Sequence, residues 1–348
     1  MTTTVPKVFA FHEFTGVAEA VADYVVNAQN LALSKEPFAL RNGAAGSSDG
    51  SSSNPNGSLA VPQTSAHISR QASGRSMSGR ESSQAPSGGA SNPNIRAPSS
   101  SKLKKMKEKR FKIALSGGSL IQVLHEGLLK RTDVHWGKWD IYFADERLVP
   151  FDSPESNYGL AKRKIIDLID SDAFGSPRVF HINESLIDDP QECADDYEKV
   201  LIKGFAGRDS VKLPMFDLFL LGCAPDGHIA SLFPNFQENL RENLAWVIPV
   251  TEAPSGPSNR ISLTIPVICH SHQVTFVVEG STKAPVVKTI MERPEKGLPS
   301  SIVNEGAAGR VVWFVDDDAL TDVFVTKKKY KFLVASENPE RSSPANTG

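Results

Sequence analysis

The sequence predicts an α/β fold: a single Rossmann-like domain with a largely parallel sheet flanked by helices. Two observations lead to this prediction. From Phe111 onward, short apolar runs of strand length alternate with amphipathic segments of helix length, which is the pattern of βαβ units. A further strand and helix precede a long Ser-rich stretch, so that an insertion interrupts one domain. With 348 residues, 40% of them hydrophobic, the chain can build the core that such a domain requires.

The elements of this domain are expected in the following order. KVFAF is the first strand and residues 17–33 the first helix. FKIAL is the next strand, SGG a tight turn, and residues 119–131 a helix with its leucines on one face. Asp189 and Pro190 offer an N-cap and a first-turn proline for a helix at 193–205. The remaining elements are strands at 140–144, 216–222, 261–268, 274–280 and 311–315, a loop at 145–150, and helices at 158–170, from His228 and from Lys283.

Composition divides the chain into four parts. Residues 1–42 hold the first strand and helix, 43–110 a disordered insertion rich in Ser, Gly and Pro, 111–335 the remainder of the domain, and 336–348 a disordered tail. The insertion has ten Lys or Arg against three Asp or Glu, a charge of +7, so the rest of the chain carries −9. A basic arm on an acidic body suits a polyanion such as RNA, although basic residues also solubilise linkers. Three Arg-x-x-Ser motifs in the insertion are candidate phosphorylation sites: Ser73, Ser78 and Ser83.

Several classes of protein are excluded by the sequence. No run approaches the roughly 18 to 20 apolar residues that span a bilayer, and we expect neither secretion nor a membrane partner. Cys193, Cys223 and Cys269 lie far apart without metal-ligand spacing. They are therefore expected to be buried thiols in a reducing compartment, with no disulfide, no metal and no cofactor.

Ligands of such sheets bind outside the carboxyl ends of the strands, and several candidate residues are expected there. Ser116, Gly117 and Gly118 lie between a strand and a helix, where backbone N–H groups can bind a phosphate; an ordinary strand-to-helix turn explains the same glycines. Arg260 precedes a strand and Lys283 follows one. Each is either a phosphate ligand or a solvated cation.

Two further candidates carry more specific chemistry. Arg147 can bind a phosphate bidentately while Asp145 or Glu146 holds the guanidinium in place; a surface ion pair is the alternative. His228 follows Asp226 and a glycine at the end of a third strand. A lone histidine is usually structural, but this position favours a general base.

Taken together, these segments resemble the 6-phosphogluconolactonase family, which is similar in fold to glucosamine-6-phosphate deaminases and ribose-5-phosphate isomerases. LSGGS, FADERLVPFDSPESNYG, LLGCAPDGHIASLFP, RISLTIPVI and EGSTKAPVVKTI occur in the family's order. The resemblance implies a sugar-phosphate ligand, 6-phosphogluconolactone or 6-phosphogluconate, and hydrolysis of the lactone in the oxidative pentose phosphate pathway without metal or nucleotide. It implies that His228 deprotonates the attacking water and that Asp226 orients His228. The phosphate ligands that it implies are Ser116, Gly117, Gly118, Arg147, Arg260 and Lys283.

Three positions depart from the family's usual residues, which are Gly, Thr and His. Ala224 restricts the backbone if a positive φ is needed, Ile229 removes a hydroxyl beside the base, and Phe236 replaces a titratable ring. None of them removes the base or the phosphate ligands. We therefore expect weak or absent lactonase activity with ligand binding retained, and an active lactonase is the alternative.

The Ser-rich insertion and the block around His228 are most similar to the yeast Sol-type, 6-phosphogluconolactonase-like subgroup of this family. Members of that subgroup are associated with the subcellular distribution of tRNA. The resemblance therefore implies an indirect link to tRNA export machinery and a location in the cytoplasm and the nucleus. No RNA-binding signature accompanies the basic run, and it lacks interleaved aromatic residues apart from Phe111. Direct RNA contact is therefore the less favoured form of this link, and DNA is not an expected partner.

Overall fold

The computed structural model of the chain describes residues 6–34, 108–205 and 213–333. The chain divides into two compact units, residues 1–35 with 108–348, and residues 36–107; every described residue belongs to the first. The predictions of a disordered insertion, a disordered tail and phosphorylated serines therefore lie outside the described residues, except at the end of the insertion. At that end, Arg110 already belongs to the folded domain, because its Nε donates to a carboxylate oxygen of Asp140 at 2.6 Å.

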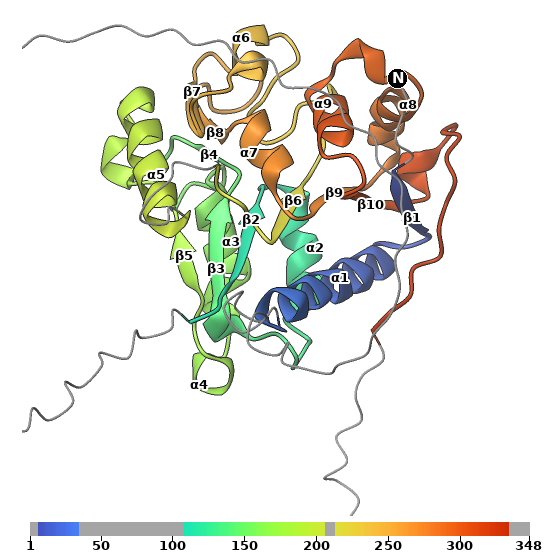
Figure 1. Ribbon diagram of the computed structural model, residues 1–348, viewed down its shortest axis with the longest axis horizontal. Coiled ribbons are helices and arrows are strands. Elements are labelled where there is room, and N and C mark those ends of the chain that lie inside the picture. The colour runs from blue at the N-terminus through green and yellow to red at the C-terminus, as the bar shows by residue number, and fades with distance from the viewer. Residues whose placement is uncertain (1–5, 35–107, 206–212, 334–348) are drawn as a thin grey trace, which may run out of the picture. The chain divides into compact units, whose positions relative to one another are not determined.

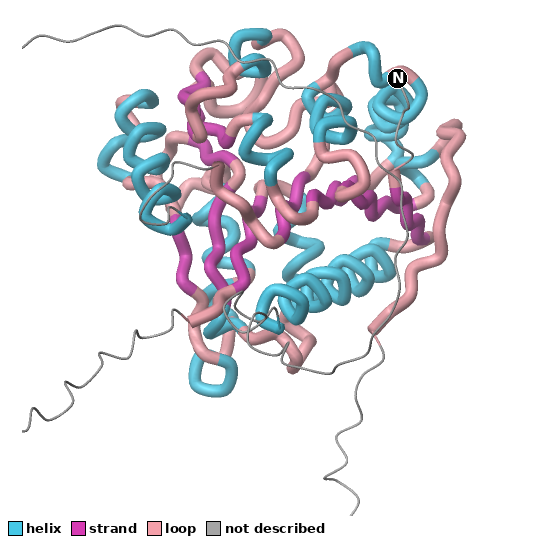
Figure 2. The backbone as a smooth tube through the Cα atoms, in the orientation of Figure 1, coloured by secondary structure: helices cyan, strands magenta, loops and turns pink. Residues whose placement is uncertain are grey.

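Seven parallel strands form the central sheet in the order β1-β10-β9-β6-β2-β3-β5 (Figures 1 and 2). The strands are β1 (Lys7–Phe11), β2 (Phe111–Leu115), β3 (Trp139–Phe143), β5 (Arg178–Phe180), β6 (Leu218–Leu221), β9 (Val274–Val278) and β10 (Val311–Asp316). Because β1 pairs with β10, the segment before the insertion completes a sheet built from the segment after it. The predicted fold class is confirmed.

Side chains of these strands alternate between two hydrophobic cores, one on each face of the sheet. Along β6, Leu218 and Leu220 belong to one core, while Phe219 and Leu221 belong to the other. Both faces are covered by helices, which is why the strands read as continuous apolar runs (Figure 1). One face packs against α1 (Phe14–Ser34), α2 (Ser119–Leu128) and α3 (Asn157–Lys164), and the other against α5 (Pro190–Phe205), α7 (Ile265–His270), α8 (Ala284–Glu292) and α9 (Pro299–Gly306).

A small antiparallel sheet lies beside the parallel one, and two of the element boundaries predicted from the sequence are wrong because of it. Its strands are β4 (Asp145–Arg147), β8 (Arg260–Leu263) and β7 (Val247–Val250), in the order β4-β8-β7. The segment expected to be a loop at 145–150 thus begins with a strand. The strand expected at 261–268 ends at Leu263, because Pro266 lies in the first turn of α7, where a residue without an N–H is tolerated.

The helix expected to begin at His228 is also absent. Residues 224–228 form a turn instead, in which the Ala224 N–H donates to the His228 carbonyl at 3.1 Å and the Gly227 N–H donates to the Ala224 carbonyl at 2.9 Å. The next helix, α6 (Gln237–Arg241), begins only after this turn and the loop that follows it. A turn leaves the His228 ring beside the strand ends rather than on a helix face.

The helix beginning at Pro190 has the N-cap that the sequence predicts, because a carboxylate oxygen of Asp189 accepts from the Glu192 N–H at 3.0 Å. The helix predicted at 158–170 is shorter than expected: α3 ends at Lys164, and a separate short helix, α4 (Ser171–Phe174), follows.

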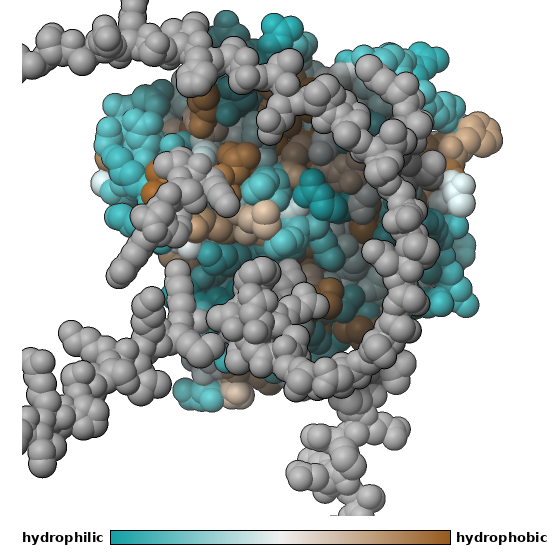
Figure 3. All heavy atoms as spheres, viewed as in Figure 1, coloured by the Kyte–Doolittle hydropathy of each residue, from teal (hydrophilic) through white to brown (hydrophobic). Residues whose placement is uncertain are grey.

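Among the described residues, few large apolar side chains are exposed; Leu244 and Phe324 are two of them. The visible surface mixes hydrophilic residues with small hydrophobic patches (Figure 3). Within the described ranges, no helix combines the length and the apolar character that a membrane span requires.

Candidate functional site

A pocket of about 240 Å³ lies at the carboxyl ends of β2 and β6. It brings together six of the eight residues that the sequence singled out: Ser116, Gly117, Gly118, Arg147, His228 and Lys283. A larger pocket of about 320 Å³ lies beside Ile290 and Phe324, but no basic residue lines it. We place the candidate site for an anionic ligand in the first pocket because it collects these six residues.

The turn between β2 and α2 needs both of its glycines. A Cβ atom at Gly117 would lie 1.8 Å from Oδ1 of Asn157, so no side chain fits there. Gly118 has φ 69° and caps α2, and open space surrounds it. The Oγ of Ser116 accepts from the Gly222 N–H at 2.9 Å, which fixes this turn to the end of β6. The N-terminus of α2 is thus open to the pocket, where its N–H groups and dipole favour an anion.

Two cations line the same pocket. Arg147 reaches it from β4, and Lys283 from the short helix Ser281–Lys283 that follows β9. The Nη1 of Arg147 donates to the Glu155 carbonyl oxygen at 2.7 Å and lies 3.5 Å from the Glu155 carboxylate. Its buried Nε has no hydrogen-bond partner among the described residues. A guanidinium held by Glu155 at the wall of a pocket is suited to a phosphate.

The carboxylates before Arg147 do not hold its guanidinium, so that prediction was wrong; Glu155 does. Asp145 instead accepts from the Ser231 hydroxyl at 2.7 Å and from the Asn157 amide at 3.2 Å.

Glu146 accepts from the N–H groups of Asn157 and Tyr158 at 2.7 and 2.8 Å, in the first turn of α3. Burial raises the pKa of Glu146 to about 7, and these donors oppose the rise.

Asn157 is a site residue to which the sequence analysis gave no role. It lines the pocket, and its amide nitrogen donates to the Asp145 carbonyl at 3.0 Å while its oxygen faces Gly117. The signal available in the sequence was the Ser156 N-cap, whose hydroxyl accepts from the Gly159 N–H and sets Asn157 at the helix start. Its closeness to the glycine turn depends on tertiary packing.

His228 has the geometry of an oriented neutral base. Its Nδ1 lies 2.7 Å from Oδ1 of Asp226, and the same oxygen accepts from the His228 backbone N–H at 3.1 Å. A carboxylate oxygen accepts but does not donate, so Nδ1 carries the proton and Nε2 has a free lone pair. The pKa of His228 lies below its ordinary value, chiefly because the ring is buried; Asp226 opposes this effect. Asp226 does not line the pocket and acts through His228.

The three departures from the family pattern differ in their position. Ala224 does not have a positive φ, so the backbone conflict expected there is absent. Phe236 lies outside the pocket, with its ring centre 5.6 Å from that of Phe233, and lines a different depression beside Pro249. Ile229 lines the pocket next to His228, and its side chain, 1% exposed, packs into the core. Ala224 and Ile229 both line the pocket, and of these two only Ile229 stands where the family has a hydroxyl.

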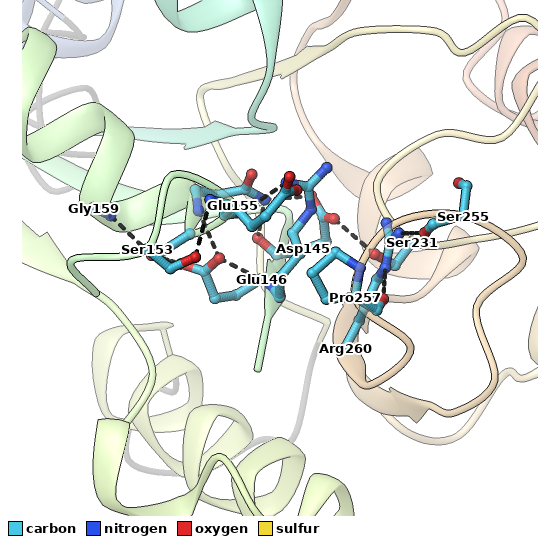
Figure 4. Close-up of polar contacts among 12 residues, drawn as sticks. Asp145, Glu146, Ser153, Glu155, Gly159, Ser231, Ser255, Pro257 and Arg260 are labelled. Carbon is cyan, nitrogen blue, oxygen red and sulfur yellow. Dashed lines mark hydrogen bonds and ion pairs between the residues drawn. The ribbon is translucent and has the colours of Figure 1, made fainter. Parts of the chain in front are cut away.

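The structure does not bring Arg260 into the pocket wall. Its side chain is buried, and the guanidinium donates to the carbonyl oxygens of Ser255 and Pro257 (Figure 4). The role of phosphate ligand that the resemblance implies for Arg260 is therefore not supported by its position. The pocket also contains Cys223, which is buried with its pKa raised to about 12, so the thiol is neutral.

Comparisons with known proteins agree on one family. The model of the family described as "Glucosamine-6-phosphate isomerases/6-phosphogluconolactonase" matches residues 96–313. The chain is 74% identical over 332 residues to the Saccharomyces cerevisiae protein named 6-phosphogluconolactonase-like protein 1, covering 95% of this chain and 98% of that one. It is 45% identical over 213 residues to a probable 6-phosphogluconolactonase of Schizosaccharomyces pombe, covering 60% and 82%. The solved 6-phosphogluconolactonase of Trypanosoma cruzi, at 21% identity and a TM-score of 0.58 over 91% and 97% of the two chains, has the same fold.

Proposed function

Because the chain belongs to the glucosamine-6-phosphate isomerase/6-phosphogluconolactonase family, we propose that its pocket binds 6-phosphogluconolactone and hydrolyses the lactone ester. The observation that carries this proposal is the oriented His228 imidazole in the same pocket as an anion site. A lactone is an activated ester, so a positioned base and bound phosphate are sufficient catalysts. The product is 6-phosphogluconate.

In the proposed reaction the phosphate binds the α2 N-terminus, Arg147 and Lys283, which places the carbonyl carbon near His228. Nε2 of His228 takes a proton from a water molecule as the water oxygen bonds to that carbon. The tetrahedral intermediate then collapses, the bond to the ring oxygen breaks, and the imidazolium returns the proton to that oxygen. Asp226 stabilises the imidazolium and fixes its tautomer throughout.

We propose that this turnover is weak and that Ile229 limits it. Ala224 causes no backbone conflict and Phe236 lies outside the pocket, which leaves Ile229, next to His228, as the departure that removes a hydroxyl from the pocket wall. An aliphatic side chain beside His228 offers no hydrogen bond to the attacking water or to the lactone oxygens.

Replacement of Ile229 by threonine is expected to raise kcat by about 10-fold or more, because a hydroxyl then stands beside the base. Ile229→Val has the same branching without the hydroxyl and is the matched control. Initial rates on freshly generated 6-phosphogluconolactone, corrected for spontaneous hydrolysis, measure the effect. An equal gain in both variants, or a gain in Phe236→His alone, would assign the limitation to another cause.

Replacement of Arg147 by alanine is expected to raise KM for the phosphorylated lactone by about 10- to 100-fold with a smaller change in kcat. The reason is the loss of the guanidinium that lines the pocket. Arg147→Lys is expected to recover only part of the loss, and Lys162→Ala, an exposed cation paired with Asp167, is the control. An unchanged KM in Arg147→Ala would remove this residue from the phosphate site.

A second function, an indirect link to tRNA distribution and export, is proposed from the charge difference between the +7 insertion and the −9 remainder. On this proposal the protein acts in the cytoplasm and the nucleus. Deletion of residues 43–101 is expected to leave lactone hydrolysis unchanged and to abolish any effect on tRNA distribution. Salt-dependent binding of purified tRNA to residues 43–110 alone would show direct contact in place of an indirect link.

A further inference from the structure

Arg260 is a buried cation close to the candidate base, and it forms no ion pair with the described residues. Its side chain is 2% exposed, and the guanidinium donates to carbonyl oxygens of the loop before β8, with Nε 3.0 Å from that of Pro257 (Figure 4). No carboxylate of the described residues lies within ion-pair distance of it. Burial and the neighbouring Arg147 lower the pKa of Arg260, while Asp145 and Glu155 raise it, and an arginine stays charged at neutral pH. Its charge therefore acts on the groups packed around it.

Arg260 and His228 contact the same aromatic ring. The guanidinium carbon of Arg260 lies 5.3 Å from the ring centre of Phe233, and the imidazole centre of His228 lies 4.5 Å from it. Phe233 is itself 1% exposed, so the ring is fixed and excludes water. Charges in such surroundings are screened less than charges at the surface.

The charges around His228 come from several elements and act in opposite directions. Asp226 in the same turn and Asp145 of β4 both raise the pKa of His228, whereas burial and Arg260 of β8 lower it. The two pocket cations, Arg147 and Lys283, line the same cavity. Asp226 is needed to fix the tautomer, but its charge favours the imidazolium, which cannot act as a base. A cation that opposes Asp226 without contacting the ligand preserves both properties.

We propose that Arg260 is a positioning residue for hydrolysis: it packs with His228 on Phe233, and its positive charge opposes that of Asp226 while Asp226 orients the imidazole. This role rests on the proposed function of His228 as the base. It replaces the role of phosphate ligand, because Arg260 donates to its own loop and does not reach the pocket wall.

The test combines an NMR titration of the His228 ring with the pH dependence of lactone hydrolysis in Arg260→Gln and Arg260→Lys. In Arg260→Gln the His228 pKa is expected to rise, and the rate near pH 6 to fall by roughly 3- to 10-fold, with little change above about pH 8. Arg260→Lys keeps the charge and is expected to retain the wild-type profile. KM for the phosphorylated lactone is expected to stay unchanged in both. Phe233→Leu is a second variant, in which the rate is expected to fall at every pH because the shared ring is lost.

An unchanged His228 titration in folded Arg260→Gln would overturn the proposal. A rise in KM like that expected for Arg147→Ala would also overturn it, because Arg260 would then be a phosphate ligand. A shifted titration in a protein whose hydrolysis does not depend on His228 would support the charge coupling and refute the proposed function, so the two failures are distinguishable.

Discussion

Replacement of His228 by glutamine is expected to lower kcat for 6-phosphogluconolactone by about 10²- to 10⁴-fold, the range associated with loss of a general base. Glutamine keeps a polar group of similar reach, and binding of the product 6-phosphogluconate is expected to persist because the phosphate site lies on other residues. Hydrolysis rates and a thermal shift with 6-phosphogluconate measure the two effects. His125→Gln, a change on helix α2, is the control.

The pH dependence gives the same base a second test. The pKa of His228 is lowered from its ordinary value of 6.5, chiefly by burial, and only the neutral ring can accept a proton. The wild-type rate is therefore expected to hold as pH falls to 6.5 and to decline only below it. A decline centred above 6.5, or a profile unchanged in His228→Gln, would exclude His228 as the base.

Replacement of Asp140 by alanine is expected to lower the free energy of unfolding by about 3 to 5 kcal/mol, the largest effect on stability that we predict. Asp140 is 1% exposed, and its carboxylate accepts from Nε of Arg110 at 2.6 Å and from Nε of Arg178 at 2.7 Å. Arg110 is nearly buried and also donates to the Gly137 and Trp139 carbonyls, so it cannot turn to solvent. Without Asp140, the carboxylate partner that remains to it among the described residues is the exposed Glu108 at 3.8 Å, so its charge stays buried and poorly compensated.

Urea unfolding of the full chain measures this effect. The matched control is Arg178→Gln, because Arg178 is 55% exposed at its side chain and its loss leaves the Asp140–Arg110 pair intact. We expect that control to cost less than about 1 kcal/mol. Equal losses in the two variants would mean that burial of Arg110 does not determine the cost.

The sequence predicted most of the parallel sheet because its strands are buried on both faces. VVWFV is apolar at every position and FKIAL at every position except Lys112, and helices of clear amphipathic period lie between such strands. The glycine turn, Arg147, His228 and Lys283 could be found for a related reason: polar or flexible residues at strand ends stand out against apolar runs. Their meeting in one pocket then follows from the parallel order of the strands.

The remaining features depend on contacts between segments far apart in the chain. Pairing of β4 with β8 places Arg147 opposite Arg260, and no local pattern reports that register. The same packing gives Arg147 its partner Glu155 and turns Arg260 into its own loop. Asn157 likewise belongs to the site only through its contact with Gly117, a residue far from it in the sequence.

The central claim is that one pocket recognises the phosphate and hydrolyses the lactone. Its most direct test compares the hydrolysis of 6-phosphogluconolactone with that of unphosphorylated gluconolactone by the wild-type protein, each corrected for the spontaneous rate. We predict slow but measurable acceleration for the phosphorylated lactone, with kcat/KM about 10²-fold or more above that for the unphosphorylated one, because Arg147, Lys283 and the α2 N-terminus bind only the former. No acceleration of either lactone, or equal acceleration of both, would contradict the claim.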